Sequence, residues 1–260
     1  MACRNEAKAN TAKANILTEV PRADLKVMVL DLNSLDSVRK FAKNFEEKFT
    51  HLDLLINNAG IMVPPFSQTK DGFESQMGVN YFSHFLLTGL LLPILNKTEG
   101  ARVISLSSKA HEQGKIDFEN LNSEKDYSRL GAYSQSKLAC LMYAYELDRR
   151  LKQAGSSVIS IAAHPGASNT ELARHLPRWL YYLLYPIVTL ISHSPKNGTL
   201  PQLQAAIDLN VAGGDYFGPT GFNGMKGKPG KVESKPHSHD KDVARKLWKV
   251  SEELTGINYL

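Results

Sequence analysis

Short β-branched runs alternate with longer stretches of helical period along this chain. The strand candidates cover 26–32, 52–57, 102–108 and 157–164, and the helix candidates cover 34–49, 72–95, 132–154, 195–209 and 240–255. This alternation predicts βαβ units and a parallel sheet. Because the strand candidates are almost continuously apolar, we expect helices on both faces of that sheet. The predicted fold class is therefore α/β, with a doubly wound parallel sheet.

Nothing along the chain marks a boundary between domains. No repeat, low-complexity tract or linker interrupts the pattern, so we expect a single domain over residues 1–260. Ser34 and Asp36 provide an N-cap and a first-turn acid for the helix candidate at 34–49. The glycine-rich segment from Gly213 to Gly230 is expected to form loops beyond the last strand.

Charge and cysteine content narrow the classes of partner. The net charge of +5 and the pI near 9.0 come from 31 basic residues spread among 26 acidic ones. We therefore expect no nucleic-acid partner. Cys3 and Cys140 lack metal or redox spacing, which predicts two buried thiols in a reducing compartment rather than a disulfide or a zinc site.

The apolar segments bear on location. The N-terminal residues MACRNEAKANTAKAN lack the apolar core of a signal peptide, so we expect a cytoplasmic protein. The most apolar stretch, from Trp179 to Ile191, is too short for a membrane span and contains Pro186. We interpret residues 179–191 as a lid over a substrate pocket, and peripheral contact with a membrane is the alternative.

Tyr133 and Lys137 are the first candidates for chemistry. They stand four residues apart in a helical segment, so both side chains project from one face of the helix. A nearby ammonium favours the ionised form of a phenol, which makes the phenol a better acid and base near neutral pH. The pair alone is weak evidence, because exposed Tyr/Lys pairs arise by chance on many helices.

Three features upstream strengthen this interpretation. Ser108 ends the strand candidate 102–108, at the sheet edge where open α/β sheets bind ligands. Gly60 follows the strand candidate 52–57 and allows the backbone to approach a ligand closely. Asn80 is a polar residue among apolar neighbours in a helix, and a buried amide bonded to backbone is its structural alternative.

Taken in order, these motifs resemble one family. NNAG (57–60), Asn80, Ser108, Tyr133-x-x-x-Lys137 and HPG (164–166) resemble the motifs of the short-chain dehydrogenase/reductase superfamily. The segments 107–122 and 238–256 resemble its retinol dehydrogenase-like branch and the bacterial relatives of that branch. The resemblance runs from Ala2 to the C-terminus. It implies a Rossmann-like fold and nicotinamide-dependent hydride transfer between a hydrophobic alcohol and its aldehyde or ketone.

The resemblance also implies a role for each candidate residue. Ser108 would hydrogen-bond the substrate oxygen, and Tyr133 would donate or accept the substrate proton. Lys137 would support the tyrosine and hold the nicotinamide ribose. Asn80 would support a water-linked proton path to Lys137.

By the same resemblance the cofactor is NADP(H), with NAD(H) as the alternative. Arg4 occupies the place of a basic contact for the 2′-phosphate, and a guanidinium suits bidentate phosphate binding. A solvated arginine near a frayed terminus is the structural alternative. The other implied cofactor contacts are Asp31, Asn58, Ala59, Gly60, Tyr133, Lys137, Pro165, Gly166 and Thr170. Members of the superfamily often form homodimers through their helices, and the apolar residues around Tyr143 would serve such a contact or face the sheet.

The chain departs from the family at its start. The family opens with a strand and a Thr-Gly-x-x-x-Gly-x-Gly turn into a helix, which receives the pyrophosphate. Residues 2–4 instead resemble the end of the second strand, and TGFNGMKG (220–227) lacks the strand and helix context of a phosphate loop. We therefore expect a sheet without its first β-α unit, with the edge of 52–57 unpaired and 26–32 detached. Such a chain would be an N-terminally truncated domain that folds weakly and binds dinucleotide poorly.

Two functional interpretations remain open at this point. The first is an oxidoreductase acting on a small hydrophobic alcohol or carbonyl compound. The second is a non-catalytic, truncated remnant that cannot seat the dinucleotide. The sequence His237-x-His239-Asp240 also invites a metal site, but its position before a helical pattern favours capping by Ser238 or Asp240. No metal site is expected.

Overall fold

The computed structural model describes residues 1–166 and 194–260, and the predictions for Thr170 and for 179–191 lie outside these residues. The strands are β1 (Ala2–Cys3), β2 (Met28–Val29), β3 (Leu54–Asn57), β4 (Arg102–Leu106), β5 (Ile159–Ala163), β6 (Tyr216–Gly221) and β7 (Lys226–Lys231). The α-helices are α1 (Glu6–Glu19), α2 (Leu35–Glu46), α3 (Ser75–Met77), α4 (Ser83–Leu95), α5 (Arg129–Gln153), α7 (Pro195–Gly198), α8 (Leu200–Ile207) and α9 (Lys241–Thr255). Shorter helical turns are η1 (Gly78–Phe82), η2 (Lys109–Gln113), η3 (Phe222–Gly224) and η4 (Pro236–His239).

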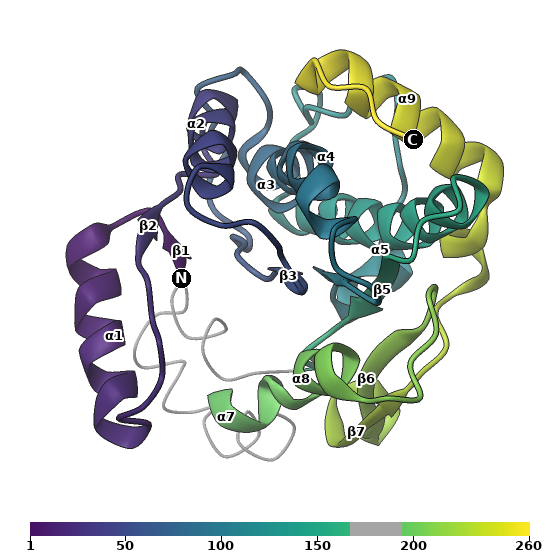
Figure 1. Ribbon diagram of the computed structural model, residues 1–260. Helices are drawn as coiled ribbons and strands as arrows, with labels where there is room; N and C mark the ends of the chain where they lie inside the picture. The colour runs from purple at the N-terminus through teal and green to yellow at the C-terminus, as the bar shows by residue number, and fades with distance from the viewer. Residues whose placement is uncertain (167–193) are drawn as a thin grey trace, which may run out of the picture.

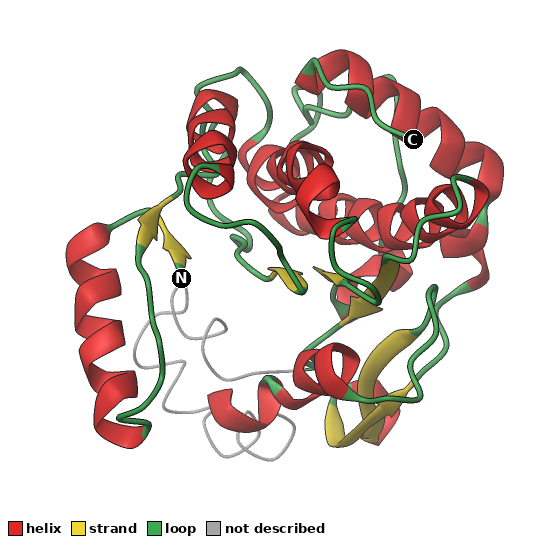
Figure 2. Cartoon of the chain, viewed as in Figure 1, coloured by secondary structure: helices red, strands yellow, loops and turns green. Residues whose placement is uncertain are grey.

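The strands form two separate sheets. The larger one has the order β3-β4-β5-β6-β7, parallel except for the last pair, and β1 pairs only with β2 in a second parallel sheet. The short strands near the N-terminus stand apart from the others in Figure 2. Within the described residues β3 is an edge strand, and its Leu54 and Ile56 side chains are partly exposed. The expected detachment of the 26–32 segment and the unpaired edge of 52–57 are both confirmed.

Helices cover both faces of the larger sheet, as predicted. The main core lies between the sheet and α2, α4, α5 and α9, which lie together in Figure 1. On the opposite face, Ala205 and Ala206 of α8 pack against Ile104, Ile161 and Phe217. Burial on both faces explains why β4 and β5 carry buried side chains at consecutive positions and do not alternate between buried and exposed ones.

Two elements differ from the prediction. The segment Gly213 to Gly230, expected as loops, contains β6 and the antiparallel edge strand β7. Its glycine and proline content hid the strands, but an edge strand tolerates Pro229 because the missing N–H would face outward. Helix α1 was not predicted, because Ala9 is its one buried residue and it has no apolar stripe. Its polar, alanine-rich sequence forms a helix by local propensity and by the Asn5 cap.

The helix caps and the cysteines bear on the question of a metal site and on the state of the thiols. Ser34 caps α2, and Asp240 caps α9 by accepting hydrogen bonds from the backbone of Asp242 and Val243. Capping therefore accounts for the His-x-His-Asp sequence, and in the described part of the chain no cluster of three His, Cys, Asp or Glu could hold a metal ion. Cys140 is buried as expected, but Cys3 is only half-buried because the small sheet leaves it partly uncovered.

The helical stretch Ser75–Leu95 is long and apolar enough to cross a membrane. However, 89% of its most apolar window is buried inside the protein. That burial is the pattern of a core helix. Tyr143 is also buried, 3% exposed, so the residues around it face the core rather than a partner subunit.

Trp248 on α9 provides a test of this core. Trp248 is 1% exposed. Its ring lies edge-on to Phe85, with ring centres 5.0 Å apart, and stacks on Tyr143, with ring centres 5.8 Å apart. Trp248→Ala should lower the free energy of unfolding by about 3–5 kcal/mol, because it leaves a cavity. Leu209→Ala, at a side chain 92% exposed, should change it by less than about 0.5 kcal/mol. Urea denaturation measures both, and equal effects would contradict this assignment of the core.

Candidate active site

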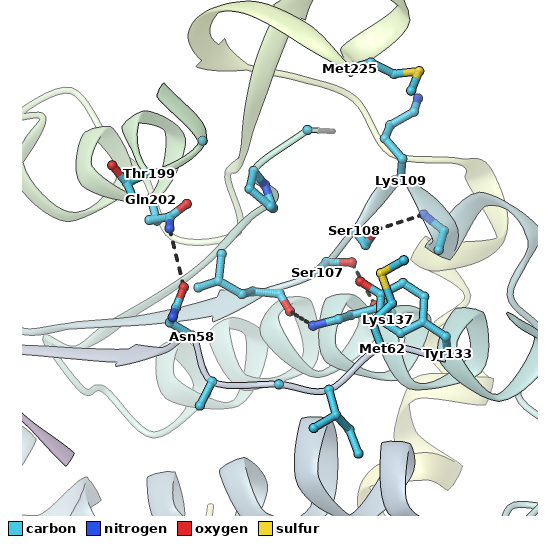
Figure 3. Close-up of a pocket in the computed structure, with 18 of the residues that line it drawn as sticks. Asn58, Met62, Ser107, Ser108, Lys109, Tyr133, Lys137, Thr199, Gln202 and Met225 are labelled. Carbon is cyan, nitrogen blue, oxygen red and sulfur yellow. Dashed lines mark hydrogen bonds between the residues drawn. The ribbon is translucent and has the colours of Figure 1, made fainter. Parts of the chain in front are cut away.

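A cavity of about 700 Å³ lies at the carboxyl ends of β3, β4 and β5. Figure 3 shows Tyr133 and Lys137 of α5 near Ser108 on one side of the cavity, with Asn58 on the facing side. Eight predicted residues line it: Asn58, Ala59, Gly60, Ser108, Tyr133, Lys137, Pro165 and Gly166. The fold therefore brings together segments that lie far apart in the sequence.

Helix α5 is fastened to the end of β4 by two hydrogen bonds of opposite direction. The Lys137 ammonium donates to the Leu106 carbonyl at 3.1 Å, and the Ser107 hydroxyl donates to the Lys137 carbonyl at 2.8 Å. Lys137 is 6% exposed, and its ammonium lies 5.8 Å from the centre of the Tyr133 ring. The pair predicted from spacing therefore shares one cavity, with the lysine fixed and the tyrosine half-buried.

Ser108 lies between the end of β4 and the start of η2. Its Oγ accepts a hydrogen bond from the backbone N–H of Ala110 at 3.2 Å, as the cap of this short helix. A hydroxyl has two acceptor lone pairs and one hydrogen. The hydrogen therefore remains available for an oxygen in the cavity.

Asn80 lies behind the cavity wall and is 1% exposed. Its carboxamide accepts from the Ile61 backbone N–H at 2.8 Å and donates to the Ile61 carbonyl at 3.0 Å. It also donates to Ser136 Oγ at 3.0 Å, which ties the 58–62 loop to α5. The expected bonding of this amide to backbone is confirmed. Asn80 lies in the π-helical turn η1, a widening of the helix that is frequent at functional sites.

The cavity wall near β3 is formed by residues 58–62. A Cβ at Gly60 would stand 3.0 Å from Asn80 Oδ1 and 3.5 Å from Lys137 Nζ, so a side chain at this position would crowd the Asn80 amide. Gln202 donates to Asn58 Oδ1 at 3.4 Å, and its own Oε1 is buried without a partner among the described residues.

The cavity wall near β5 is formed by Pro165 and Gly166. Gly166 has φ of 72°, and a Cβ there would lie 2.5 Å from the Met225 carbonyl. Met225 follows the turn of the β6–β7 hairpin and lines the cavity. The 220–227 segment thus supplies an apolar wall residue. Contrary to the expectation it does follow a strand, β6, but the chain then makes the short turn η3 and enters the strand β7.

The residues that line the cavity are not the same set as the residues predicted from the sequence. Arg4 and Asp31 follow β1 and β2 and do not line the cavity, because that small sheet does not pair with β3. The sequence analysis also missed several cavity residues, which carry no motif of their own: Ile61, Met62, Leu106, Ser107, Lys109, Ala110, Leu130, Gly198, Thr199, Gln202 and Met225. Several of these residues lie next to a recognised motif in the sequence, and this proximity was the one signal that could have predicted them.

Comparisons with known proteins agree with this geometry. A family model described as short chain dehydrogenase matches residues 1–180. The chain is 40% identical to retinol dehydrogenase 13 of Homo sapiens over 264 residues, covering 99% of this chain and 76% of that protein. It is 38% identical to retinol dehydrogenase 14 of Mus musculus over 273 residues, covering 99% and 78%. A solved structure of an uncharacterized protein from Mycobacterium Paratuberculosis is 39% identical, with a TM-score of 0.82, covering 100% of this chain and 84% of that one.

The chain therefore belongs to the short-chain dehydrogenase family, in its retinol dehydrogenase-like branch. It is an oxidoreductase that acts on CH–OH groups with a nicotinamide cofactor. It spans about three quarters of the length of these curated relatives.

Burial keeps two histidines near the site neutral. Desolvation lowers the pKa of His164 to about 3, with His111 and Lys109 adding to the effect. Desolvation also lowers the pKa of His84 to about 4, with Lys137 as a further cause. His84 Nδ1 lies 3.0 Å from the Asn80 carbonyl, so this nitrogen carries its hydrogen.

These shifts predict acid destabilisation. In the unfolded chain histidines take up protons near pH 6.5, whereas in the folded chain His84 and His164 do so only near pH 4 and 3. The free energy of unfolding should therefore fall as the pH drops from 6.5 toward 4, by roughly 2 kcal/mol per histidine at pH 5.

Urea denaturation between pH 7 and 5 measures the effect. His84→Asn, which keeps a donor for the Asn80 carbonyl, should make the dependence shallower. His51→Gln, at an exposed histidine, should leave it unchanged. A flat profile in the wild-type chain would be inconsistent with neutral buried histidines.

Proposed function

We propose that this chain interconverts a hydrophobic alcohol and its aldehyde or ketone with NADP(H), and that Tyr133 transfers the proton. The observation that supports this most directly is the convergence of Ser108, Tyr133 and Lys137 on one cavity. The bound nicotinamide would supply or accept the hydride. The protein would supply orientation, a proton and a dry environment.

In this proposal each polar side chain has a separate task. The free hydrogen of Ser108 donates to the substrate oxygen, and Tyr133 gives a proton to that oxygen or takes one from it. The fixed Lys137 side chain would hold the nicotinamide ribose beside the tyrosine. Asn80 holds the 58–62 loop and supports the proton path to Lys137.

The cofactor would rest mainly on the β3 side of the cavity. Asn58, Ala59 and Gly60 supply close backbone, and Lys137, Pro165 and Gly166 face the same space. Arg4 and Asp31 would contact the adenosine end, with Arg4 selecting NADP(H) over NAD(H).

The substrate would be apolar. Ile61, Met62, Leu130 and Met225 supply apolar walls, and apolar pockets with a few polar groups select hydrophobic ligands. The retinol dehydrogenases at 38–40% identity make retinaldehyde a suitable probe. A cytoplasmic protein with peripheral membrane contact through 179–191 is part of the same proposal, as is a homodimer.

Tyr133→Phe tests the proton transfer. It removes only the phenolic hydroxyl, so turnover of retinaldehyde at millimolar NADPH should fall at least about 100-fold, while NADPH affinity stays nearly unchanged. Tyr145→Phe is the matched control, because the Tyr145 hydroxyl on the same helix bonds Ser234, away from the cavity. A Tyr133→Phe variant that keeps most of its kcat would remove this tyrosine from the reaction.

Fluorescence titration with NADPH and NADH tests cofactor binding. We expect NADPH to bind more tightly than NADH. Arg4→Ala should abolish that preference, because the guanidinium would no longer pair with the 2′-phosphate. A preference for NADPH that survives in Arg4→Ala would remove Arg4 from the 2′-phosphate contact, and absence of turnover at millimolar NADPH would favour the non-catalytic interpretation.

A further inference from the structure

The backbone of Ser108 is held by one residue that no step above uses. The carbonyl oxygen of Ser108 accepts two hydrogen bonds from His111, one from its backbone N–H at 3.0 Å and one from Nδ1 of its ring at 2.7 Å. A carbonyl oxygen has two lone pairs. His111 therefore satisfies both, and the ring bond is the shorter of the two.

The chemistry of this contact fixes the state of the imidazole. A carbonyl oxygen only accepts, so Nδ1 of His111 carries the hydrogen. Nε2 is buried and has no hydrogen-bond partner within the described residues, so a second hydrogen there would lack an acceptor. Desolvation lowers the pKa of His111, which agrees with a neutral ring.

The ring has little freedom to move. It is 1% exposed and lies edge-on to Tyr216, with ring centres 5.7 Å apart. The His111 carbonyl in turn accepts from the Gly114 backbone at 3.0 Å, and His237 Nε2 lies 3.1 Å from the same oxygen. The donor that meets Ser108 is therefore preorganised.

Ser108 needs such a restraint because it lies just beyond the sheet. The Ser107 backbone N–H donates to the Ala163 carbonyl at 2.8 Å, which is the last sheet-like bond at this end of β4. From Ser108 onward the chain turns into η2, and a single 3₁₀ turn is held by bonds of poorer geometry than an α-helix. The hydrogen bond from the His111 side chain therefore holds the Ser108 backbone at the point where the hydrogen bonds of the sheet end.

We propose that His111 is a positioning residue, which fixes the backbone of Ser108 so that the serine hydroxyl faces the reacting oxygen of the substrate. This rests on the proposed function, because it takes Ser108 as the substrate contact. The bond is made to the serine carbonyl, so its loss would disturb the orientation of the hydroxyl without removing the hydroxyl. A donor that meets the developing charge of the transition state affects kcat more than KM.

Three substitutions at His111 separate positioning from packing. His111→Asn keeps an N–H near the place of Nδ1, His111→Gln keeps volume but moves the amide away, and His111→Ala removes both. Because a displacement of about 1 Å can cost 100-fold in rate, kcat for retinaldehyde should fall about 10- to 100-fold in the Ala and Gln variants. The Asn variant should stay within about threefold of wild type, and KM should change little throughout.

The control is His239→Ala, at a histidine that stacks on Tyr145 at 4.7 Å and does not touch Ser108. Its kcat should equal that of the wild type. Equal losses in the Ala, Gln and Asn variants, or a rise in KM with unchanged kcat, would overturn the positioning role.

Crystal structures of the wild type and the Ala and Asn variants keep this inference distinct from the proposed function. Ser108 should shift in the Ala variant and stay in place in the Asn variant. If the wild type has no turnover, the proposed function fails, and the structures alone decide the positioning role. An unmoved Ser108 in the Ala variant would then refute it.

Discussion

The paired hydrogen bonds between helix α5 and the end of β4 determine the geometry of the site. Lys137 donates to Leu106 through its side chain, and Ser107 donates to Lys137 through its own, so neither element can slide along the other without breaking both bonds. Tyr133 lies one turn earlier on the same helix and is placed by the same contacts. Burial of an ammonium costs free energy unless the ammonium has hydrogen-bond acceptors. The end of β4 provides one acceptor, the Leu106 carbonyl, and leaves the side of the ammonium that faces the cavity open.

The opposite wall depends on a polar side chain inside an apolar helix. Asn80 binds both backbone groups of Ile61 and also Ser136 of α5, so a single carboxamide joins the loop after β3 to the helix that carries Tyr133. The widened turn of η1 places this amide within a core that is otherwise apolar. Because the carboxamide is fully bonded, its burial stabilises one loop conformation rather than leaving unpaired groups.

Much of the fold follows from local pattern. The alternation of apolar strands and helices identified β3, β4, β5 and most helices, because buried parallel strands must be apolar on both faces. The β6–β7 hairpin was missed, since its glycines and prolines are held in strands by pairing between β6 and β7, with Tyr216 and Phe217 of β6 pairing with β5, and not by local preference. Helix α1 was missed for the opposite reason, because it forms by propensity and buries almost nothing.

For the site, the sequence by itself determined the family, the order of its motifs and the pairing of Tyr133 with Lys137, since a four-residue spacing on a helix fixes a shared face. Only the tertiary structure decided which residues meet. It joined Asn58, Ser108 and Met225 around one cavity, left Arg4 and Asp31 outside it, and placed the His111 ring against the Ser108 carbonyl. The reason is physical: contacts between segments far apart in the chain depend on how strands pair and helices pack, and sequence spacing does not encode those distances.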